Sequence, residues 1–224
     1  MNLSITIVSA ANSWMNTHIP RLIEQMKGSG NQTGWIHDVN SLPHGDLAFY
    51  LSCEQIVSAK LRERNRHNLV VHASDLPRGR GWSPLSWKIV NGENSVPIVL
   101  FEAADQVDSG DIYLRDTIEY TGFELLGELR EALAEASIRL CLSFIEQYPA
   151  IVHLASKQHG EATYYPKRTA RDSRLDPDRT IREQFNLMRI ADNEKYPCYF
   201  ELGGCQYILS IVKKSGDPVK GEQK

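Results

Sequence analysis

His72 is the residue of this chain whose type and position best suit chemistry. It directly follows Leu69-Val70-Val71, an apolar run typical of a buried strand, and it begins a polar loop that contains Ser74 and Pro77. Open parallel sheets place their sites beyond the carboxyl ends of the strands, so an imidazole here lies in the favoured place. Because imidazole titrates near neutrality, His72 is a candidate general acid or base, and the alternative is an ordinary loop or capping residue.

A carboxylate is predicted to join this imidazole. A second apolar run, residues 96–101, leads into an acidic loop that reaches Asp108. If both strands end at the same rim, this loop lies beside His72. A carboxylate there accepts a hydrogen bond from the ring, fixes its orientation and relays a proton. The alternative for Asp108 is a turn-forming residue before Ser109-Gly110.

The elements that must position these residues alternate along the chain. Strands are expected over residues 3–9, 34–37, 47–51, 69–71 and 96–101, and helices over 14–27, 54–63, 84–90 and 123–147. Asn12 or Ser13 is the expected cap of the first helix. Strands separated by helices favour an α/β fold with a doubly wound, mostly parallel sheet and right-handed crossovers.

The composition changes after Pro149 and becomes rich in polar and charged residues. This part is expected to hold a strand, a helix and a hairpin turning at Gly203-Gly204; the ranges are 162–165, 178–190, 198–202 and 205–212. We therefore predict a main domain over 1–150, a small C-terminal α+β region over 151–224, and a frayed tail from Ser215.

Composition and charge exclude several classes of protein. The chain has 224 residues and a net charge of -3, which gives no electrostatic reason to expect nucleic acid. Its four cysteines form no CxxC pair and have no His at ligand spacing, so we expect reduced thiols with neither metal nor disulfide. The first residues lack the charged region of an export signal, and no apolar run approaches the ~18 residues of a membrane span. A cytoplasmic location follows as an expectation.

The stretch His72-Ala-Ser74-Asp-Leu76-Pro77, followed by Gly81, Pro84 and Asp108-Ser-Gly110-Asp111, resembles the formyltransferases that use 10-formyltetrahydrofolate. That family includes glycinamide ribonucleotide transformylase, methionyl-tRNA formyltransferase and the sugar N-formyltransferases. The resemblance implies a Rossmann-like core, transfer of a formyl group to a primary amine, and 10-formyltetrahydrofolate as the donor.

The segment from Tyr164 to Phe200 looks like the corresponding part of sugar N-formyltransferases that act on nucleotide-linked amino sugars. Residues 68–84 look most like the branch that formylates a UDP-linked 4-amino-4,6-dideoxy sugar on the pseudaminic acid route. This resemblance implies a UDP- or dTDP-linked sugar as acceptor and a role in lipopolysaccharide or other surface glycan biosynthesis.

One position departs from the family pattern. The family places an Asn two residues before its His, and Val70 stands there in this chain. A bulge could bring Asn68 to the site, another donor could replace the amide, or the three-residue machinery is incomplete. An amide donor matters because removing one oxyanion donor typically costs on the order of a hundredfold in rate. His72, Asp108 and Asn68 are accordingly the expected catalytic residues.

The resemblance also places the ligands. The folate is expected along the segment after the third strand and against the acidic loop; these residues are Leu51, Ser52, Cys53, Gln55, Ile56, Ala104 and Asp105. Guanidinium groups and glycines suit phosphate, and aromatic rings stack on a base or a sugar. The expected acceptor residues are Ser74, Arg78, Gly79, Arg80, Trp82, Tyr164, Lys167 and Arg189, for which solvation or core packing is the competing interpretation.

Two other functions stay open at this point. The chain could be a glycinamide ribonucleotide transformylase-like enzyme, or a catalytically silent folate-binding module for which Val70 is the supporting feature. The helix over 123–147 and the terminal hairpin are both candidates for a homodimer contact.

Overall fold

The computed structural model describes residues 2–214 and is built on a six-stranded sheet of order β2-β1-β3-β4-β6-β7. Its strands are β1 (Ser4–Val8), β2 (Gln32–Ile36), β3 (Gly45–Tyr50), β4 (Asn65–His72), β6 (Ser95–Glu102) and β7 (Ile112–Glu119). The first four run parallel, whereas β6 is antiparallel to β4 and β7 is antiparallel to β6. This mostly parallel sheet with helices confirms the predicted fold class.

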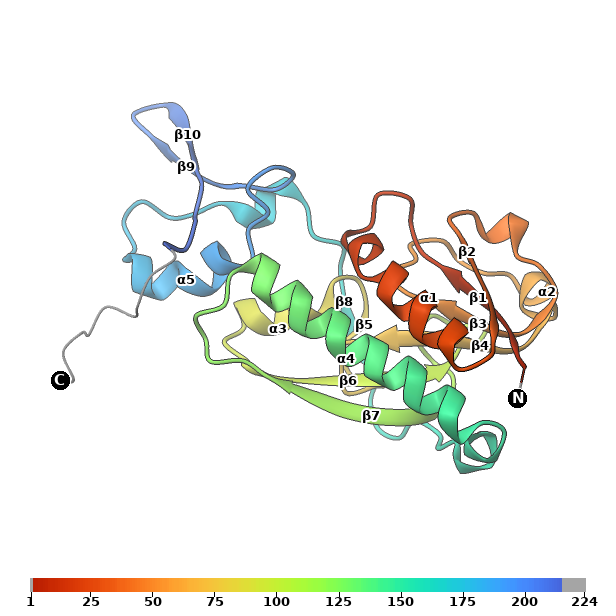
Figure 1. The fold of residues 1–224 in the computed structure, drawn as a ribbon. Coiled ribbons are helices and arrows are strands. Elements are labelled where there is room, and N and C mark those ends of the chain that lie inside the picture. The colour runs from red at the N-terminus through yellow and green to blue at the C-terminus, as the bar shows by residue number, and fades with distance from the viewer. Residues whose placement is uncertain (1, 215–224) are drawn as a thin grey trace.

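One face of the sheet carries the main core. Helices α1 (Ile19–Gly28) and α4 (Leu126–Gln147) lie in front of the strands in Figure 1. Because side chains alternate along a strand, Ile7, Phe49 and Leu69 all point to these helices, where Phe144 meets Phe49 edge to face at 6.3 Å.

The opposite face of the sheet carries a second hydrophobic cluster and the side chain of His72. Val8 and Tyr50 pack there with Val70, beneath the loop after β3 and the one-turn helix α2 (Ala59–Arg62). His72 follows Val70 by two residues in the same strand, so its side chain is on this face. The site is therefore on the side of the sheet away from α1 and α4.

The first two helices differ from expectation in their bounds. A 3-10 turn, η1 (Trp14–Thr17), precedes α1, and Ser13 caps it by accepting from the amide of Met15 at 3.1 Å, as one of the two predicted caps. Pro20 lies in the first turn of α1, where its missing N–H costs nothing, so the single predicted helix divides before it. The helix predicted over 54–63 is reduced to α2.

The antiparallel direction of β6 corrects the argument that brought Asp108 to His72. Glu102, at the end of β6, pairs with Leu69, whereas His72 pairs with Val99. The carboxyl ends of β4 and β6 are therefore at opposite rims. Asp108 reaches His72 because the chain after Glu102 folds back over the sheet before β7, a strand that we did not predict.

The C-terminal part contains η3 (Ala150–Leu154), β8 (Tyr164–Tyr165), η4 (Ala170–Ser173), α5 (Ile181–Arg189) and the hairpin β9 (Cys198–Leu202) and β10 (Cys205–Leu209). In Figure 1, α5 and the hairpin extend away from the main sheet. β8 instead pairs in parallel with β5 (Arg80–Gly81), just after the His72 loop, and α3 (Pro84–Val90) follows with its predicted bounds. The boundary at residue 150 stays a prediction, and the predicted frayed tail lies outside the described residues.

None of the helices formed by residues 2–214 combines the length and the apolar character that crossing a membrane requires.

Candidate active site

His72 is the last residue of β4, and its side chain is only 9% exposed. Its Nε2 lies 2.8 Å from the carbonyl oxygen of Gly79. A carbonyl oxygen can only accept, so Nε2 must carry a hydrogen in this arrangement. The polar loop after β4 thus curls back onto the ring and fixes its tautomer.

Asp108 lies beside the same ring nitrogen. Its Oδ2 is 3.7 Å from Nε2 of His72 and accepts a hydrogen bond from the amide of Gly81 at 2.8 Å. Both side chains are largely shielded, with 9% and 12% exposure. The predicted imidazole and carboxylate therefore meet, and together they can donate to a developing oxyanion and accept a proton.

Two glycines let the loop close on the site. Gly79 and Gly81 have φ values of +74° and +94°, which L side chains rarely adopt. A Cβ at Gly79 would lie 2.8 Å from the Tyr165 ring, and one at Gly81 would lie 2.6 Å from the Tyr165 carbonyl oxygen. The β5 and β8 pairing, which lays residues 163–165 against the loop, requires glycine at both positions.

Asn68 is not brought to His72. β4 pairs with β3 in one continuous register, without the bulge that could have moved it, and four residues along a strand span about 13 Å. The Asn68 side chain accepts from the Tyr50 hydroxyl at 2.9 Å and donates to the Arg62 carbonyl at 2.9 Å. Its amide is held within the sheet and the α2 turn, so we do not carry Asn68 into the proposed catalytic set.

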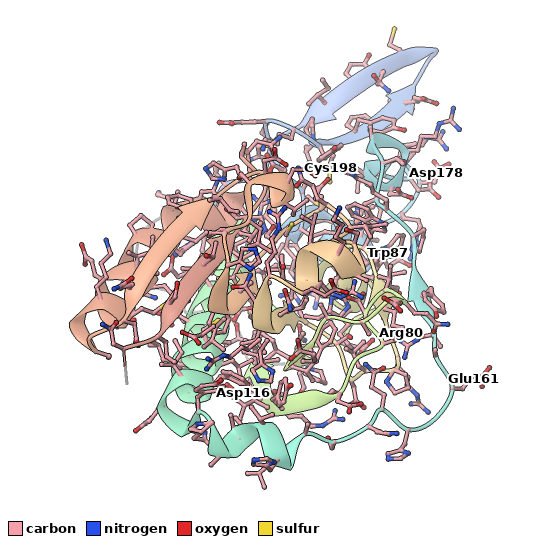
Figure 2. The ribbon with its side chains drawn as sticks, turned by 90° about the vertical axis from the view of Figure 1, so that its right-hand side faces the viewer. Arg80, Trp87, Asp116, Glu161, Asp178 and Cys198 are labelled. Carbon is pink, nitrogen blue, oxygen red and sulfur yellow. The ribbon has the colours of Figure 1, made fainter. Side chains whose placement is uncertain are left out.

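The residues of the His72 loop divide between the interior and the surface. Ser74 is fully buried, and its hydroxyl finds no hydrogen-bond partner within residues 2–214. Arg80 is 9% exposed and turns inward, whereas Arg78 between them is exposed to solvent. Figure 2 shows Arg80 and Trp87 on the side of the molecule where the segment around Glu161 passes. Of the two arginines, Arg78 is the one that can meet a ligand directly.

The two segments expected to hold the folate are linked by a residue that the sequence did not single out. Arg62 donates to the carbonyl of Val57 at 2.6 Å and also pairs with Asp105. It therefore ties the loop after β3 to the loop after β6. A basic residue at the end of a helix is common, so the sequence gives no sign of this role.

The expected folate residues themselves differ in exposure. Ile56 is 82% exposed at the tip of the first loop, and Val107 is 52% exposed on the second. Leu51 is buried, Gln55 accepts from the amide of Val39 at 2.9 Å, and Cys53 contacts the Gln55 carbonyl. Burial raises the pKa of the Cys53 thiol, which disfavours the reactive thiolate. Ser52, Ala104 and Asp105 lie at the surface of the two loops.

An exposed cationic and aromatic group lies beside the loop after β3. The Nζ of Lys167 is 4.2 Å from the centre of the Trp82 ring and 3.0 Å from a Glu54 carboxylate oxygen. Tyr164 nearby is 63% exposed. Such a surface can stack on a ring and attract a phosphate.

Arg189 has a different place from the one expected. Its side chain is fully buried and bonds Glu124 at 3.2 Å, Asn186 at 3.1 Å and also Asn94. A guanidinium without exposed surface does not contact a ligand, so we treat Arg189 as the anchor of α5 and not as an acceptor residue.

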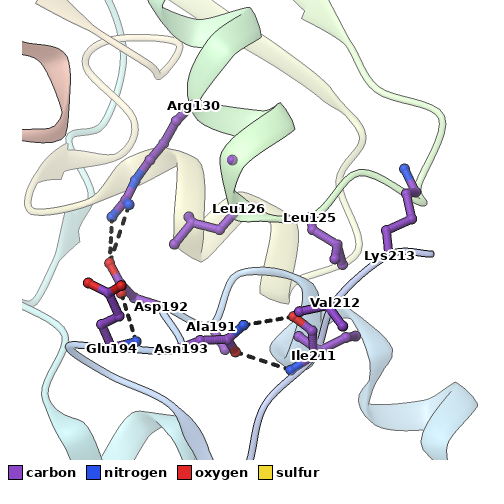
Figure 3. A pocket seen from close by; sticks show the side chains of 11 residues that line it. Leu125, Leu126, Arg130, Ala191, Asp192, Asn193, Glu194, Ile211, Val212 and Lys213 are labelled. Atoms are coloured by element: carbon purple, nitrogen blue, oxygen red, sulfur yellow. Dashed lines mark hydrogen bonds and ion pairs between the residues drawn. The ribbon is translucent and has the colours of Figure 1, made fainter. Parts of the chain in front are cut away.

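The cavity of about 380 Å³ in Figure 3 lies elsewhere, between the start of α4 and residues 191–194 and 211–213. Its lining includes the ion pair of Arg130 with Asp192 at 3.3 Å and the hydrogen bonds between Asn193 and the main chain of Ile211. It contains none of the expected site residues. Among the described residues, no group of three metal-ligating side chains comes together.

Comparison with known proteins gives the same family for just under half of the chain. Residues 35–145 match the family model described as formyl transferase. Methionyl-tRNA formyltransferase of Kosmotoga olearia is 34% identical over 125 residues, which is 55% of this chain and 40% of that protein. That of Alkaliphilus oremlandii is 30% identical over 148 residues, or 64% and 47% of the two chains. The chain thus spans less than half the length of these relatives.

Solved structures show the same fold. Methionyl-tRNA formyltransferase from Clostridium thermocellum superposes with a TM-score of 0.78 at 21% identity and covers 96% of both chains. A 4-N formyltransferase from Francisella tularensis gives 0.70 at 18%, covering 95% and 98%. HypX from Aquifex aeolicus in complex with tetrahydrofolic acid gives 0.80 at 16%, covering 94% of this chain and 38% of that one. With His72 and Asp108 inside the matched span, the part of this chain from residue 35 to 145 belongs to the formyl transferase family.

Proposed function

We propose that this protein transfers a formyl group from 10-formyltetrahydrofolate to the amino group of a nucleotide-linked amino-dideoxy sugar. The observation that carries the proposal is the pair of His72 and Asp108, 3.7 Å apart and shielded beneath the Gly79–Gly81 loop. In acyl transfer to an amine, an imidazole N–H can donate to the oxyanion and a carboxylate can accept the proton of the amine.

The two side chains have separate tasks. The Nε2–H of His72, which donates to the Gly79 carbonyl oxygen in this structure, turns to the formyl oxygen as that oxygen becomes an oxyanion. The Asp108 carboxylate accepts a proton from the attacking amine. The amine nitrogen first bonds to the formyl carbon, and the bond from that carbon to N10 of the folate then breaks as the oxyanion returns to a carbonyl. The proton that Asp108 took from the amine passes to N10, so protons and electrons balance.

The donor, 10-formyltetrahydrofolate, supplies the formyl group, and we propose that it binds to the loops after β3 and β6. Ile56 and Val107 expose apolar surface on these loops, and Arg62 links them. The structural neighbour HypX, solved with tetrahydrofolic acid, supports a folate on this fold. Main-chain groups of residues 51–56 and 104–107 would hold the pterin.

The acceptor is placed against the exposed group of Arg78, Trp82, Tyr164 and Lys167. A sugar N-formyltransferase from Shewanella sp FDAARGOS_354, which superposes on 96% of this chain with a TM-score of 0.70 at 15% identity, supports a sugar substrate. The relatives of higher sequence identity are methionyl-tRNA formyltransferases, which makes tRNA the second candidate. The net charge of -3 favours the smaller substrate, because nucleic acid binding normally needs a basic surface.

The test is a single assay with a panel of acceptors. The protein is mixed with 10-formyltetrahydrofolate and with UDP- and dTDP-linked 3-amino and 4-amino dideoxy sugars, glycinamide ribonucleotide or methionyl-tRNA. Tetrahydrofolate release and the formylated product are followed by absorbance and mass spectrometry. We expect turnover with a nucleotide-linked sugar and none with the variant H72A. Tight folate binding without turnover on any amine would favour the silent module instead.

A further inference from the structure

The side chain of Gln158 joins the two loops that hold the catalytic pair. Its Nε2 lies 2.9 Å from the carbonyl oxygen of Asp108 and 2.9 Å from that of Gly110, and its Oε1 lies 2.6 Å from Nη2 of Arg80. Resting on the proposed function, we propose that Gln158, supported by Arg80, is a positioning residue that sets the Asp108 carboxylate for formyl transfer.

Only an amide fits this place. Two carbonyl oxygens demand a donor with two hydrogens, and a guanidinium demands an acceptor, so the partners fix which end of the Gln158 amide is which. A carboxylate would keep Arg80 but would face both carbonyls without a hydrogen to donate. An aliphatic side chain would lose all three contacts.

Asp108 needs this support because of its backbone. Its φ of +52° lies in the left-handed region, which a non-glycine residue keeps only where the surroundings hold it. The Gln158 amide holds its carbonyl, and the amide of Gly81 holds its carboxylate at 2.8 Å. Two residues further on, a Cβ at Gly110 would lie 1.7 Å from the carbonyl oxygen of Glu102, so the turn has little room to shift.

Arg80 completes the support from the other loop. Its guanidinium contacts Gln158 and, at 3.4 Å, the Tyr164 hydroxyl, and its side chain is 9% exposed. It belongs to β5, one residue before Gly81. One chain of contacts therefore leads from the loop over His72 through Arg80 and Gln158 to Asp108. This assigns Arg80 a role inside the site, whereas we had expected it to bind the acceptor.

Gln158 comes from a part of the chain that the family match does not reach. The match ends at residue 145, and residues 156–165 cross back over the site, with Ser156 paired to Ile112 and Thr163 accepting from the amide of Gly79 at 2.9 Å. This crossing segment ties the C-terminal region to the geometry of the catalytic loops.

The experiment compares the full-length protein with the variants Q158E and Q158L. We expect kcat to fall by about tenfold to a hundredfold, as for a small displacement of a reacting group, with KM for 10-formyltetrahydrofolate changed by less than about twofold. The double variant D108N/Q158L should have a kcat less than about twofold below that of D108N alone, because Gln158 acts through Asp108. Additive losses, or Q158E equal to wild type, would overturn the proposal.

A second measurement does not depend on activity. Hydrogen exchange of peptides covering residues 78–84 and 103–112 should become about tenfold faster in Q158L, since the loop opens locally. The matched control is Q147E on α4, where the exposed Gln147 donates a hydrogen bond to the Ser143 hydroxyl. This variant should leave kcat and exchange unchanged. If the wild type formylates no acceptor, the proposed function fails. Hydrogen exchange still tests whether Gln158 holds the Asp108 loop in place. Unchanged hydrogen exchange in Q158L would overturn the positioning role of Gln158, even where turnover is measured.

Discussion

Nε2 of His72 donates to the carbonyl oxygen of Gly79 across 2.8 Å. The ring therefore enters any reaction with its hydrogen on the nitrogen that faces Asp108, and it acts first as a donor. This arrangement gives the acceptor task to the carboxylate, which is 3.7 Å from the same nitrogen. The two groups thus share the work of acid and base.

Replacing the imidazole is the direct test of this division. We expect H72Q to lower kcat by about a hundredfold or more, because general acid catalysis contributes on the order of 10²–10⁴. Initial rates of tetrahydrofolate release measure the effect, and circular dichroism checks that the fold is kept. The control is H44Q in an exposed loop, which should match wild type. Equal rates for H72Q and wild type would remove His72 from the mechanism.

The second prediction separates two reasons for glycine in the His72 loop. Gly81 has a φ of +94° and lies where a Cβ would meet the Tyr165 carbonyl at 2.6 Å, whereas Gly30 has a φ of +84° and open space around it. G30A should lower the free energy of unfolding by about 1 kcal/mol, because only the left-handed backbone conformation is penalised there. G81A should lower the free energy of unfolding by roughly 2 kcal/mol more than G30A, because the main chain at Tyr165 must also move. Urea unfolding measures both, and equal losses would show that the contact with Tyr165 does not matter.

The residues of the His72 loop were predictable because their types are tied to local geometry. Glycine at positive φ, Pro at the start of α3 and a β-branched run before His72 follow from rules that act over a few residues. The sheet and most helices could be placed for the same reason. The likeness to a known family then favoured a catalytic role for Asp108 over the alternative of a turn residue.

What could not be predicted depends on contacts between distant residues. β6 runs antiparallel to β4, and on its other side it pairs with β7, an edge strand whose mixed polar pattern gave no signal. Arg62 and Gln158 act through carbonyl groups, which every residue type offers, so their roles leave no pattern in the sequence. Arg189 was placed at the acceptor site by its charge, yet its partners Glu124 and Asn94 lie far away along the chain.

The third prediction concerns Val70, which occupies the position of the family's Asn. Val70 is half-buried on the His72 face and packs near Phe101 and Ile112. If a missing amide donor limits the rate, V70N should raise kcat about tenfold or more. It should also cost about 1–3 kcal/mol of stability, since an amide enters an apolar cluster. V70T is the control of similar size; a rate for V70N at or below that of V70T would show that another group already serves the oxyanion.

The last prediction uses the acid stability of the fold, which does not depend on the function. Burial disfavours the charged form of Glu124, but hydrogen bonds from the amide and hydroxyl of Thr121 and from the amide of Gly122 outweigh it. Together they lower the pKa of Glu124 from 4.5 to about 2. The buried Arg189 lies 3.2 Å from the same carboxylate.

Because the pKa of Glu124 is lower in the folded protein, the unfolded chain takes up its proton first as the pH falls. The stability that this carboxylate contributes is complete above about pH 4.5 and is lost progressively between about pH 4.5 and about pH 2. E124Q should be less stable at neutral pH by about 3 kcal/mol, since it leaves the buried Arg189 without its charged partner. Its free energy of unfolding should also fall less steeply than that of wild type below about pH 4.5. Urea titrations at several pH values test this, with the exposed E161Q as the control that keeps the wild-type slope. Parallel curves for E124Q and wild type would mean that Glu124 does not set the acid limit, and that Arg189 is held by its amide partners alone.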